Sequence, residues 1–223
     1  MKRALPFVII VSVMVGALWA GWYSKRSTVS TPRTLPSATT PLNPPSGATK
    51  LGATPPHELG SPDAPVMVEQ FGDFECPPCA SLHPVLKAMK AEFGSRLVIV
   101  FRELPLINLH PRAMDAAQAA EAAGLQGKFW EMHDLLYENQ AAWHGASDAV
   151  AIFEQYATKL NLDLEQFKRQ RGSEAVKQRI FLDQERARWI GVNSTPTVFL
   201  NGREVPLDSL GTEKLQALIR AAL

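Results

Sequence analysis

The chain has 223 residues, with 23 lysines and arginines against 22 aspartates and glutamates. A formal net charge of +1 gives no electrostatic support for nucleic-acid binding, which depends on neutralising phosphates. Only two cysteines are present, so a framework of several disulfides is excluded as the basis of the fold.

The N-terminus predicts an apolar helix. Lys2 and Arg3 precede an apolar run over residues 5–23, and about 19 such residues are enough to cross a bilayer. Aromatic residues gather at the far end of the run, as they do at membrane interfaces. We predict a single-pass membrane anchor within residues 1–26. The alternative is a cleaved signal peptide, and either segment would export the rest of the chain.

Residues 27–59 are rich in serine, threonine and proline and nearly lack large apolar side chains. Such a segment cannot bury enough surface to offset its ordering entropy, so we predict a disordered linker. Residues 60–223 are long enough for one domain with a substantial core.

The domain begins with a β-α-β pattern. Apolar runs at residues 66–71 and 97–101 predict strands of a central sheet that is covered on both faces. Between them, apolar residues recur at helical spacing from Leu82 to Phe93, and Gly94 can end that helix. The fold class is therefore α/β.

A helix-rich block follows, with a predicted helical insertion at about residues 109–172. Ser147 and Ser173 are candidate N-caps, and Asp163 with Gln166 forms a capping-box pattern. Asn201-Gly202 predicts a hairpin with a type I′ turn. The helices are expected at 112–123, 128–138, 148–160, after Asp163 and at 173–189, followed by strands at 197–200 and 203–205 and a closing helix at 213–222.

The two cysteines stand at the first strand-to-helix junction, in Cys76-Pro77-Pro78-Cys79. A disulfide between them would close a loop too short to restrict the unfolded chain much. The pair is instead suited to a disulfide that forms and breaks repeatedly. A helix N-terminus stabilises the thiolate that disulfide exchange requires, and Pro77 at the first helical position loses no intrahelical hydrogen bond. Pro78 removes a second donor and stiffens the loop. We expect Cys79, one turn deeper, to be the more buried thiol.

Two other interpretations of the cysteines stay open. A C-x₂-C pair is also half of a zinc site, so an exported metal-binding module could use Cys76, Cys79 and a nearby histidine. No second C-x₂-C exists in the chain, which favours redox chemistry over metal binding. The domain could also be a non-catalytic partner on a stalk.

Thr195-Pro196 directly precedes the predicted hairpin. We expect a cis peptide bond here, packed opposite Cys76. That arrangement would leave the backbone of Thr195 free to pair with the extended chain of a substrate.

These segments together resemble the thioredoxin superfamily, and within it the DsbA-like exported branch. The resemblance rests on residues 71–79, 101–106, 127–130 and 191–197, and on Pro84, which matches the kink proline of the active-site helix. It covers essentially everything after the linker. It implies a thioredoxin fold with a helical insertion, Cys76 as nucleophile, Cys79 as resolving thiol, and Pro196 as the cis-proline preceded by Thr195.

The chain departs from the family in two places. Many members carry a buried acid six residues before the first cysteine, where this chain has Gln70. Glu69 should point to the other face of the sheet, and we expect Asp73 and Glu75 to be solvated loop acids. Strongly oxidising members have a histidine between the cysteines, so with prolines there we expect a less acidic Cys76.

The histidines and the apolar residues near the cysteines are further candidates for the site, and for most of them we expect a structural role instead. We expect His83 to be a partly exposed helix residue, His110 a turn or cap, and His133 and His144 surface residues. The apolar residues of the helix at 128–138 could line a substrate groove, but their helical spacing favours the core. They are Phe129, Trp130, Leu135 and Leu136.

We therefore expect a membrane-anchored enzyme whose catalytic domain lies on the periplasmic or extracellular side. It should exchange disulfides with cysteine-containing proteins, and we expect it to form disulfides and to be reoxidised by a membrane redox partner. A reductase or isomerase is the alternative. We expect no cofactor, no nucleic acid and no metal, and a monomeric chain.

Overall fold

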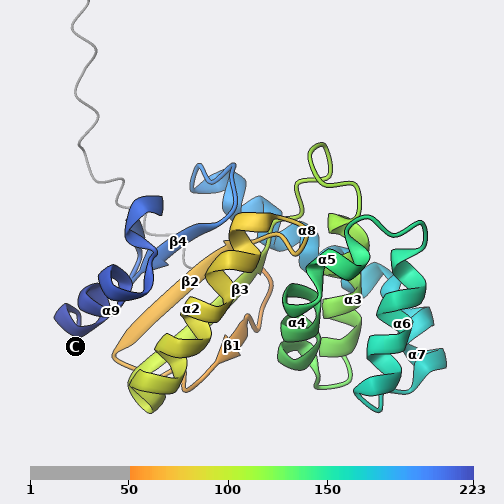
Figure 1. Ribbon diagram of the computed structural model, residues 1–223, viewed down its shortest axis with the longest axis horizontal. Coiled ribbons are helices and arrows are strands. Elements are labelled where there is room, and N and C mark those ends of the chain that lie inside the picture. Colours follow the sequence, from red (N-terminus) through yellow and green to blue (C-terminus); the bar gives the residue numbers. More distant parts are fainter. Residues whose placement is uncertain (1–50) are drawn as a thin grey trace, which may run out of the picture. The chain divides into compact units, whose positions relative to one another are not determined.

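The computed structural model describes residues 51–223, and Figure 1 shows how their elements are arranged. The sheet has five strands in the order β1-β3-β2-β4-β5. Strands β2 and β3 are parallel, and the other three neighbouring pairs are antiparallel. The strands are β1 (His57–Leu59), β2 (Val66–Gly72), β3 (Leu97–Glu103), β4 (Thr197–Leu200) and β5 (Arg203–Val205).

The predicted β-α-β unit is confirmed. Helix α2 (Pro77–Phe93) connects the parallel strands β2 and β3 through a short 3₁₀ turn. Both strands are almost entirely buried, as their apolar runs predict for a sheet covered on two faces. The other helices are α3 (Ala113–Gly124), α4 (Phe129–Glu138), α5 (Gln140–Trp143), α6 (Ala149–Lys159), α7 (Leu164–Arg171), α8 (Glu174–Trp189) and α9 (Thr212–Ala221).

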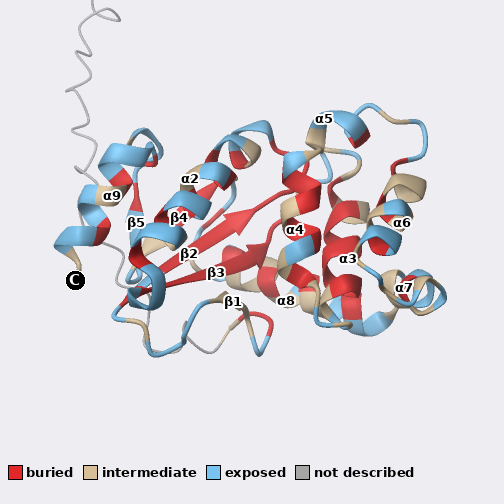
Figure 2. Ribbon diagram, turned by 60° about the horizontal axis from the view of Figure 1, so that its bottom comes forward, coloured by how far each residue is buried: buried red, intermediate tan, exposed pale blue. Residues whose placement is uncertain are grey.

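The helices cover the sheet on both faces. Apolar residues of β2 pack against α2 and α9 on one face, while Phe71 packs against Ala187 of α8 on the other. Helices α3 to α7 form a group beside the sheet, and buried residues follow β2, β3 and the inner sides of α3 and α4 (Figures 1 and 2). The thioredoxin fold with additional helices is therefore present.

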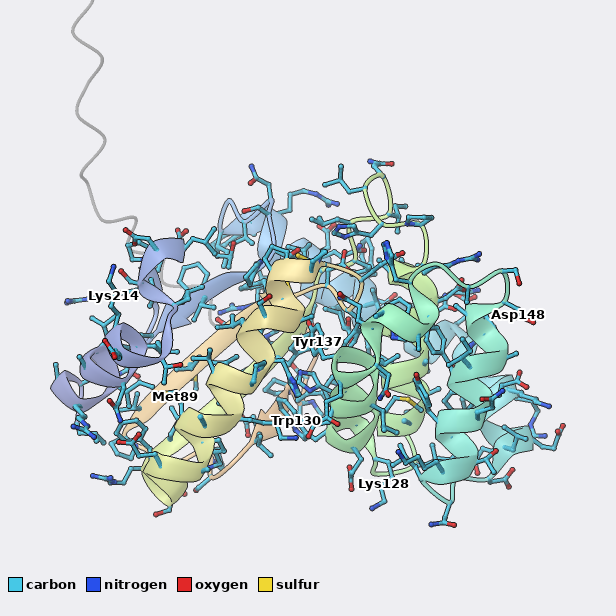
Figure 3. All side chains as sticks on the ribbon, viewed as in Figure 1. Met89, Lys128, Trp130, Tyr137, Asp148 and Lys214 are labelled. Atoms are coloured by element: carbon cyan, nitrogen blue, oxygen red, sulfur yellow. The ribbon has the colours of Figure 1, made fainter. Side chains whose placement is uncertain are left out.

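Helix α4 joins this helical group to the rest of the domain. Trp130 and Tyr137 of α4 lie on its side toward α2 and β1 (Figure 3). The indole of Trp130 donates a hydrogen bond to the Glu58 carbonyl oxygen at 3.0 Å, and the ring of Tyr137 packs on that of Phe74. Phe129 and Leu136 are buried in the core, as their helical spacing favours.

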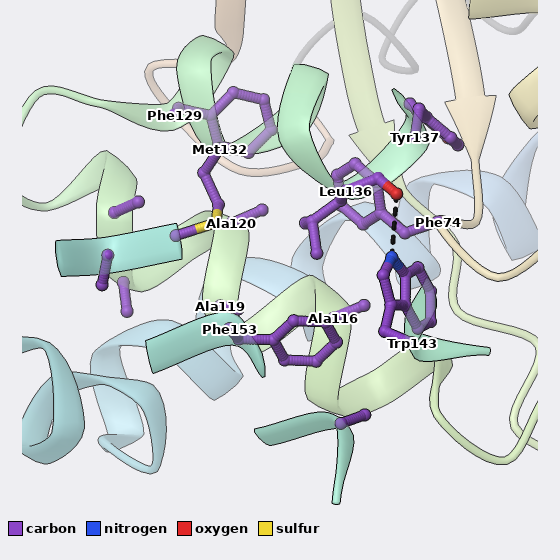
Figure 4. Close-up of a cluster of buried hydrophobic side chains, with 14 of the residues drawn as sticks. Phe74, Ala116, Ala119, Ala120, Phe129, Met132, Leu136, Tyr137, Trp143 and Phe153 are labelled. Atoms are coloured by element: carbon purple, nitrogen blue, oxygen red, sulfur yellow. Dashed lines mark hydrogen bonds between the residues drawn. The ribbon is translucent and has the colours of Figure 1, made fainter. Parts of the chain in front are cut away.

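The core of the helical group is built on small residues of α3. Ala116, Ala119 and Ala120 are fully buried, so aromatic side chains from other helices approach the α3 backbone closely (Figure 4). The indole of Trp143 donates to the Leu136 carbonyl oxygen at 2.9 Å, which satisfies its buried polar group.

Turns and caps largely follow the sequence. Asn201 and Gly202 have φ values of 47° and 79°, as a type I′ turn requires. The side chains of Asp163 and Ser173 accept hydrogen bonds at the starts of α7 and α8, as predicted. The prediction for Ser147 is wrong, because Asp148 caps α6 instead.

The predicted linker boundary at residue 59 is also wrong. Strand β1 pairs with β3, and Ala53 is buried with its N–H bound to the Asp183 carboxylate at 2.8 Å. Partners far along the chain order this segment, and its composition does not indicate them. Within residues 51–223 no helix is long and apolar enough to span a bilayer. The predicted anchor at 5–23 and the linker up to residue 50 lie outside the described residues.

Candidate active site

Cys76 and Cys79 lie at the N-terminal end of α2. Cys76 is the N-cap with an extended backbone, and Pro77 and Pro78 fill the first two helical positions. No described side chain caps this end. Pro77 and Pro78 have no N–H, so the Cys79 backbone N–H and the helix dipole are what act on Cys76. Both thiols are free, and their residues are 4% and 0% exposed. The more buried residue is Cys79, as predicted.

The loop before β4 brings the predicted substrate-contact residues to Cys76. The Thr195–Pro196 peptide bond is cis, which confirms that prediction. The Cys76 Sγ atom lies 3.3 Å from the Thr195 carbonyl oxygen, to which the protonated thiol donates a hydrogen bond. The Thr195 hydroxyl is buried and has no hydrogen-bond partner in the described part of the chain. Residues 119 positions apart thus form one site.

The two thiols have opposite acid–base properties. A hydrogen bond from the Cys79 thiol lowers the pKa of Cys76 to about 6, helped by the Cys79 backbone and opposed by burial. Burial raises the pKa of Cys79, and the hydrogen bond to Cys76 raises it further. One thiol is therefore ionised at neutral pH while the other keeps its proton, which is the division that thiol–disulfide exchange needs.

Asp73 and Glu75 are buried, so their expected role as solvated loop acids is wrong. Asp73 accepts hydrogen bonds at 2.8 Å from the Leu106 backbone N–H and from Nδ1 of His110. Glu75 accepts from the Arg112 backbone N–H. Both acids hold the loop after β3 against the active-site segment, and partners distant in sequence account for their burial.

Gln70 is buried on the α2 side of β2, and its Nε2 atom has no partner in the described residues. Glu69 faces the opposite side, as predicted, and its carboxylate binds Arg102 and Arg186 of that face at 2.8–2.9 Å. No acid therefore occupies the Gln70 position.

Two histidines differ from their expected surroundings. His83 and His133 are buried between α2 and α4, so their predicted exposure is wrong. Their rings lie 5.4 Å apart, and each hydrogen-bonds to Asp134. His110 binds Asp73 as described, whereas His144 is exposed, as predicted, and pairs with Glu75 at 3.0 Å.

Glu103 is a buried acid that sequence reasoning missed. It ends β3, is 0% exposed, and neither carboxyl oxygen has a partner among the described residues. Burial raises its pKa well above the ordinary value, and the nearby charges of Glu121 and Asp183 add to the effect. Nothing in the run of residues 97–101 signals this burial.

A groove of about 600 Å³ adjoins the site. Residues 104–109 after β3 form one wall, residues 191–193 form another, and Gln184 and Arg188 of α8 complete it. Each loop wall is linked to the dithiol segment, because Asp73 binds the Leu106 N–H and residues 191–193 lead to Thr195. Ile107 and Leu109 are 56% and 72% exposed on the same loop.

The metal interpretation of the cysteines gains no support within residues 51–223. Neither Cys76 nor Cys79 joins two other potential ligands there in a cluster with metal-binding spacing. The described cluster that has this spacing consists of His83, His133 and Asp134.

The fold and the dithiol together define a thioredoxin-like class: a thioredoxin sheet with extra helices, two thiols at the start of α2, and a cis-proline beside Cys76. A sequence profile of the thioredoxin family matches residues 53–221. The chain therefore belongs to the thioredoxin family.

Solved structures share the fold. The chain is similar to oxidised BdbD from Bacillus subtilis, with a TM-score of 0.66 and 20% identity, over 77% of this chain and 97% of that one. It is also similar to a thioredoxin-like oxidoreductase from Silicibacter pomeroyi DSS-3, with a TM-score of 0.61 and 27% identity, over 75% and 91%.

Curated relatives are more similar in sequence but much longer. The chain is 42% identical over 151 residues to Na(+)/H(+) antiporter NhaA 1 of Mycolicibacterium gilvum strain PYR-GCK, over 66% of this chain and 23% of the relative. It is 41% identical over 166 residues to NhaA 1 of Salinispora arenicola strain CNS-205, over 74% and 24%. The chain thus spans about a quarter of the length of these relatives.

Proposed function

We propose that this chain is a membrane-tethered, extracytoplasmic enzyme that forms disulfides in cysteine-containing protein substrates, with Cys76 as nucleophile and Cys79 as resolving thiol. The observation that carries the proposal is the pair of thiols at the start of α2. The pKa of Cys76 is lowered to about 6 while that of Cys79 is raised.

The reaction starts from the chain with a Cys76–Cys79 disulfide. A substrate thiolate attacks the Cys76 sulfur, forms a mixed disulfide, and releases Cys79, which takes up a proton. A second substrate thiolate then attacks the substrate sulfur of the mixed disulfide and releases Cys76 as a thiolate. The substrate leaves with a disulfide, and two electrons remain on the chain. A membrane redox partner removes them and restores the Cys76–Cys79 bond.

The acidity of Cys76 supports the oxidising direction. A thiol with a lowered pKa leaves readily, so the second step is favoured. Stabilising the thiolate also stabilises the reduced chain, and a chain with a stabilised reduced form is a stronger oxidant. Reduction or isomerisation of disulfides uses the same two thiols and is the alternative that a redox titration distinguishes.

Two features beside Cys76 support a polypeptide substrate. Pro196 has no N–H, and the Thr195 backbone lies beside the Cys76 sulfur, where it can pair with an extended chain. The adjoining groove, with Ile107 and Leu109 on its loop, offers space for side chains next to the substrate cysteine.

The location of the domain is proposed from the sequence. The apolar run at residues 5–23 would anchor the chain, and the linker would hold the catalytic domain outside the cytosol. Disulfides persist in that compartment, whereas cytosolic reductants would keep Cys76 and Cys79 reduced.

A trapping experiment tests the proposal. In Cys79→Ala the Cys76 thiolate can still open a substrate disulfide and form a mixed disulfide, but no Cys79 thiol is present to release the substrate. Substrate proteins should therefore accumulate as adducts that a reductant releases. The matched control, Cys76→Ser with Cys79→Ala, should trap nothing. A reduction potential above that of the glutathione pool would support the oxidase, and one far below it would favour the reductase. Absence of adducts in Cys79→Ala cells would contradict thiol exchange with proteins.

A further inference from the structure

Three side chains with metal-binding groups converge between α2 and α4. Nε2 of His83 lies 2.8 Å from Oδ1 of Asp134, and Nδ1 of His133 lies 3.2 Å from the same oxygen. One donor atom from each residue lies within 4.8 Å of the other two. Ligand atoms around a tetrahedral Zn²⁺ are about 3.3 Å apart, as follows from bonds of about 2.0–2.1 Å. Small shifts of these side chains would therefore let all three bind one ion.

The second ring nitrogen of His133 supplies an independent observation. Its Nε2 atom is buried and has no partner in the described residues, and the same holds for Nε2 of Gln70. Both residues line a small cavity of about 20 Å³, together with His83 and Asp134. That volume holds about one water molecule. Two buried nitrogens without partners, in residues that line this small cavity, indicate a site whose hydrogen bonding is incomplete without another component.

Gln70 is also suited to support a metal-bound histidine. A histidine that binds a metal through one ring nitrogen donates the N–H of the other to a carbonyl, carboxylate or water. If Nδ1 of His133 binds the ion, its proton lies on Nε2 and needs an acceptor. The Gln70 amide can offer its oxygen after a rotation, or the water in the cavity can connect the two groups.

We propose that His83, His133 and Asp134 form a binding site for a single divalent transition-metal ion, with Zn²⁺ as the best match. Two imidazoles and one carboxylate are ligands that zinc accepts. The ion would connect α2, which carries the dithiol, to α4 of the helical group. This site is separate from the cysteines and does not depend on the proposed exchange reaction.

Lys87 carries a positive charge next to Asp134, and this charge would repel a bound metal ion. Its Nζ atom lies 2.9 Å from Oδ2 of Asp134 and 2.7 Å from Oε1 of Glu138, and its side chain is 50% exposed. Lys87 can turn toward Glu138 and solvent when an ion enters, but its charge still weakens binding. Removing that charge should therefore tighten metal binding, an effect that a purely structural hydrogen-bond network does not predict.

The test is calorimetric titration of the full-length chain with Zn²⁺, after Cys76 and Cys79 have been oxidised so that no thiol can bind. We expect one ion per chain, and Co²⁺ in its place should give visible absorption bands of a low-coordinate nitrogen and oxygen site. Asp134→Asn should weaken Zn²⁺ binding at least about tenfold. Lys87→Gln should tighten binding several-fold, and Zn²⁺ should raise the melting temperature of the wild type.

Two exposed residues provide matched controls: Lys128 at the N-cap of α4 and Glu131 in its first turn. Glu131→Gln and Lys128→Gln repeat the same chemical changes away from the cluster and should leave Zn²⁺ binding unchanged. His133→Gln should abolish binding if it folds; if it does not, Asp134→Asn decides, because the Asp134 side chain is 34% exposed. The proposal is overturned if the oxidised wild type binds no Zn²⁺, or if Asp134→Asn binds it as tightly as the wild type.

Discussion

The two faces of the sheet differ in how their polar groups are used. On the α2 face, Cys76 keeps a free thiol at a helix N-terminus, close to Thr195. On the α8 face, three buried charges compensate one another: Arg102 binds Glu69 at 2.9 Å and Asp183 at 3.0 Å. Thiol exchange requires a thiol that is free to react, whereas charged side chains buried against the sheet destabilise the fold unless they are paired.

The comparison also shows why the ion network tolerates its burial. Burial raises the pKa of Glu69, but hydrogen bonds and charges from Arg186 and Arg102 outweigh it and lower the pKa overall. The same Arg102 guanidinium donates to the Ala53 carbonyl oxygen at 2.9 Å. The network therefore fixes the segment before β1 as well as α8.

The largest expected effect separates activity from stability. Cys76→Ser should abolish exchange with a protein disulfide, because the nucleophile is lost. Below the lowered pKa of Cys76, at about pH 5, its free energy of unfolding should stay close to that of the reduced wild type, because serine is of similar size and Cys76 carries no charge there. Insulin reduction and urea unfolding measure the two quantities. Ser81→Ala, an exposed change one turn further along α2, should leave both unchanged. Residual exchange in Cys76→Ser would assign the nucleophile elsewhere.

On the other face we expect the reverse. Arg102→Ala leaves Glu69 and Asp183 without their shared partner and should cost about 3–5 kcal/mol of stability. Urea unfolding measures this loss. Arg188→Ala, which removes an exposed pair with Glu185, should cost about 0–1 kcal/mol. A loss in Arg102→Ala no larger than that of Arg188→Ala would show that the buried network does not stabilise the fold.

A smaller effect is expected for Glu103, the unpaired acid. Burial raises its pKa, so the folded chain keeps a proton that the unfolded chain loses above the ordinary value of 4.5. Stability should therefore fall as the pH rises from 4.5 toward the raised pKa. Glu103→Gln removes this penalty and should be more stable than the wild type in mildly alkaline buffer, by urea unfolding. Glu165→Gln, an exposed change, should show no such gain, and equal pH slopes for Glu103→Gln and the wild type would refute this assignment.

Local patterns were sufficient to predict the elements and the dithiol. The apolar strands, the helical spacing after Cys79 and the Asn201-Gly202 turn each act within a few residues, so the sequence displays them directly. The N-cap position of Cys76 follows from the same local pattern. The position of Thr195 beside Cys76 was predicted from the proline that follows it and from the family resemblance.

Surroundings made by distant residues were not predictable in this way. The local sequence around Asp73 is that of a solvated loop acid. Its burial depends on hydrogen bonds from the Leu106 N–H and from His110, which lie far along the chain. His133 stands in a polar stretch of α4, yet the packing of α4 against α2 buries it. Strand β1 exists because β3 offers it a partner, and its own residues carry no strong strand pattern.

Titration of the reduced chain, followed by the ultraviolet absorbance of its thiolate, tests the central claim most directly. The lowered pKa predicts that one thiolate appears with a midpoint near pH 6, while Cys79 stays protonated in the same range. By linkage, the stability that this thiolate gives the reduced chain is lost as the pH falls through about 6. A single transition near the ordinary thiol value of 9.0 would contradict the account.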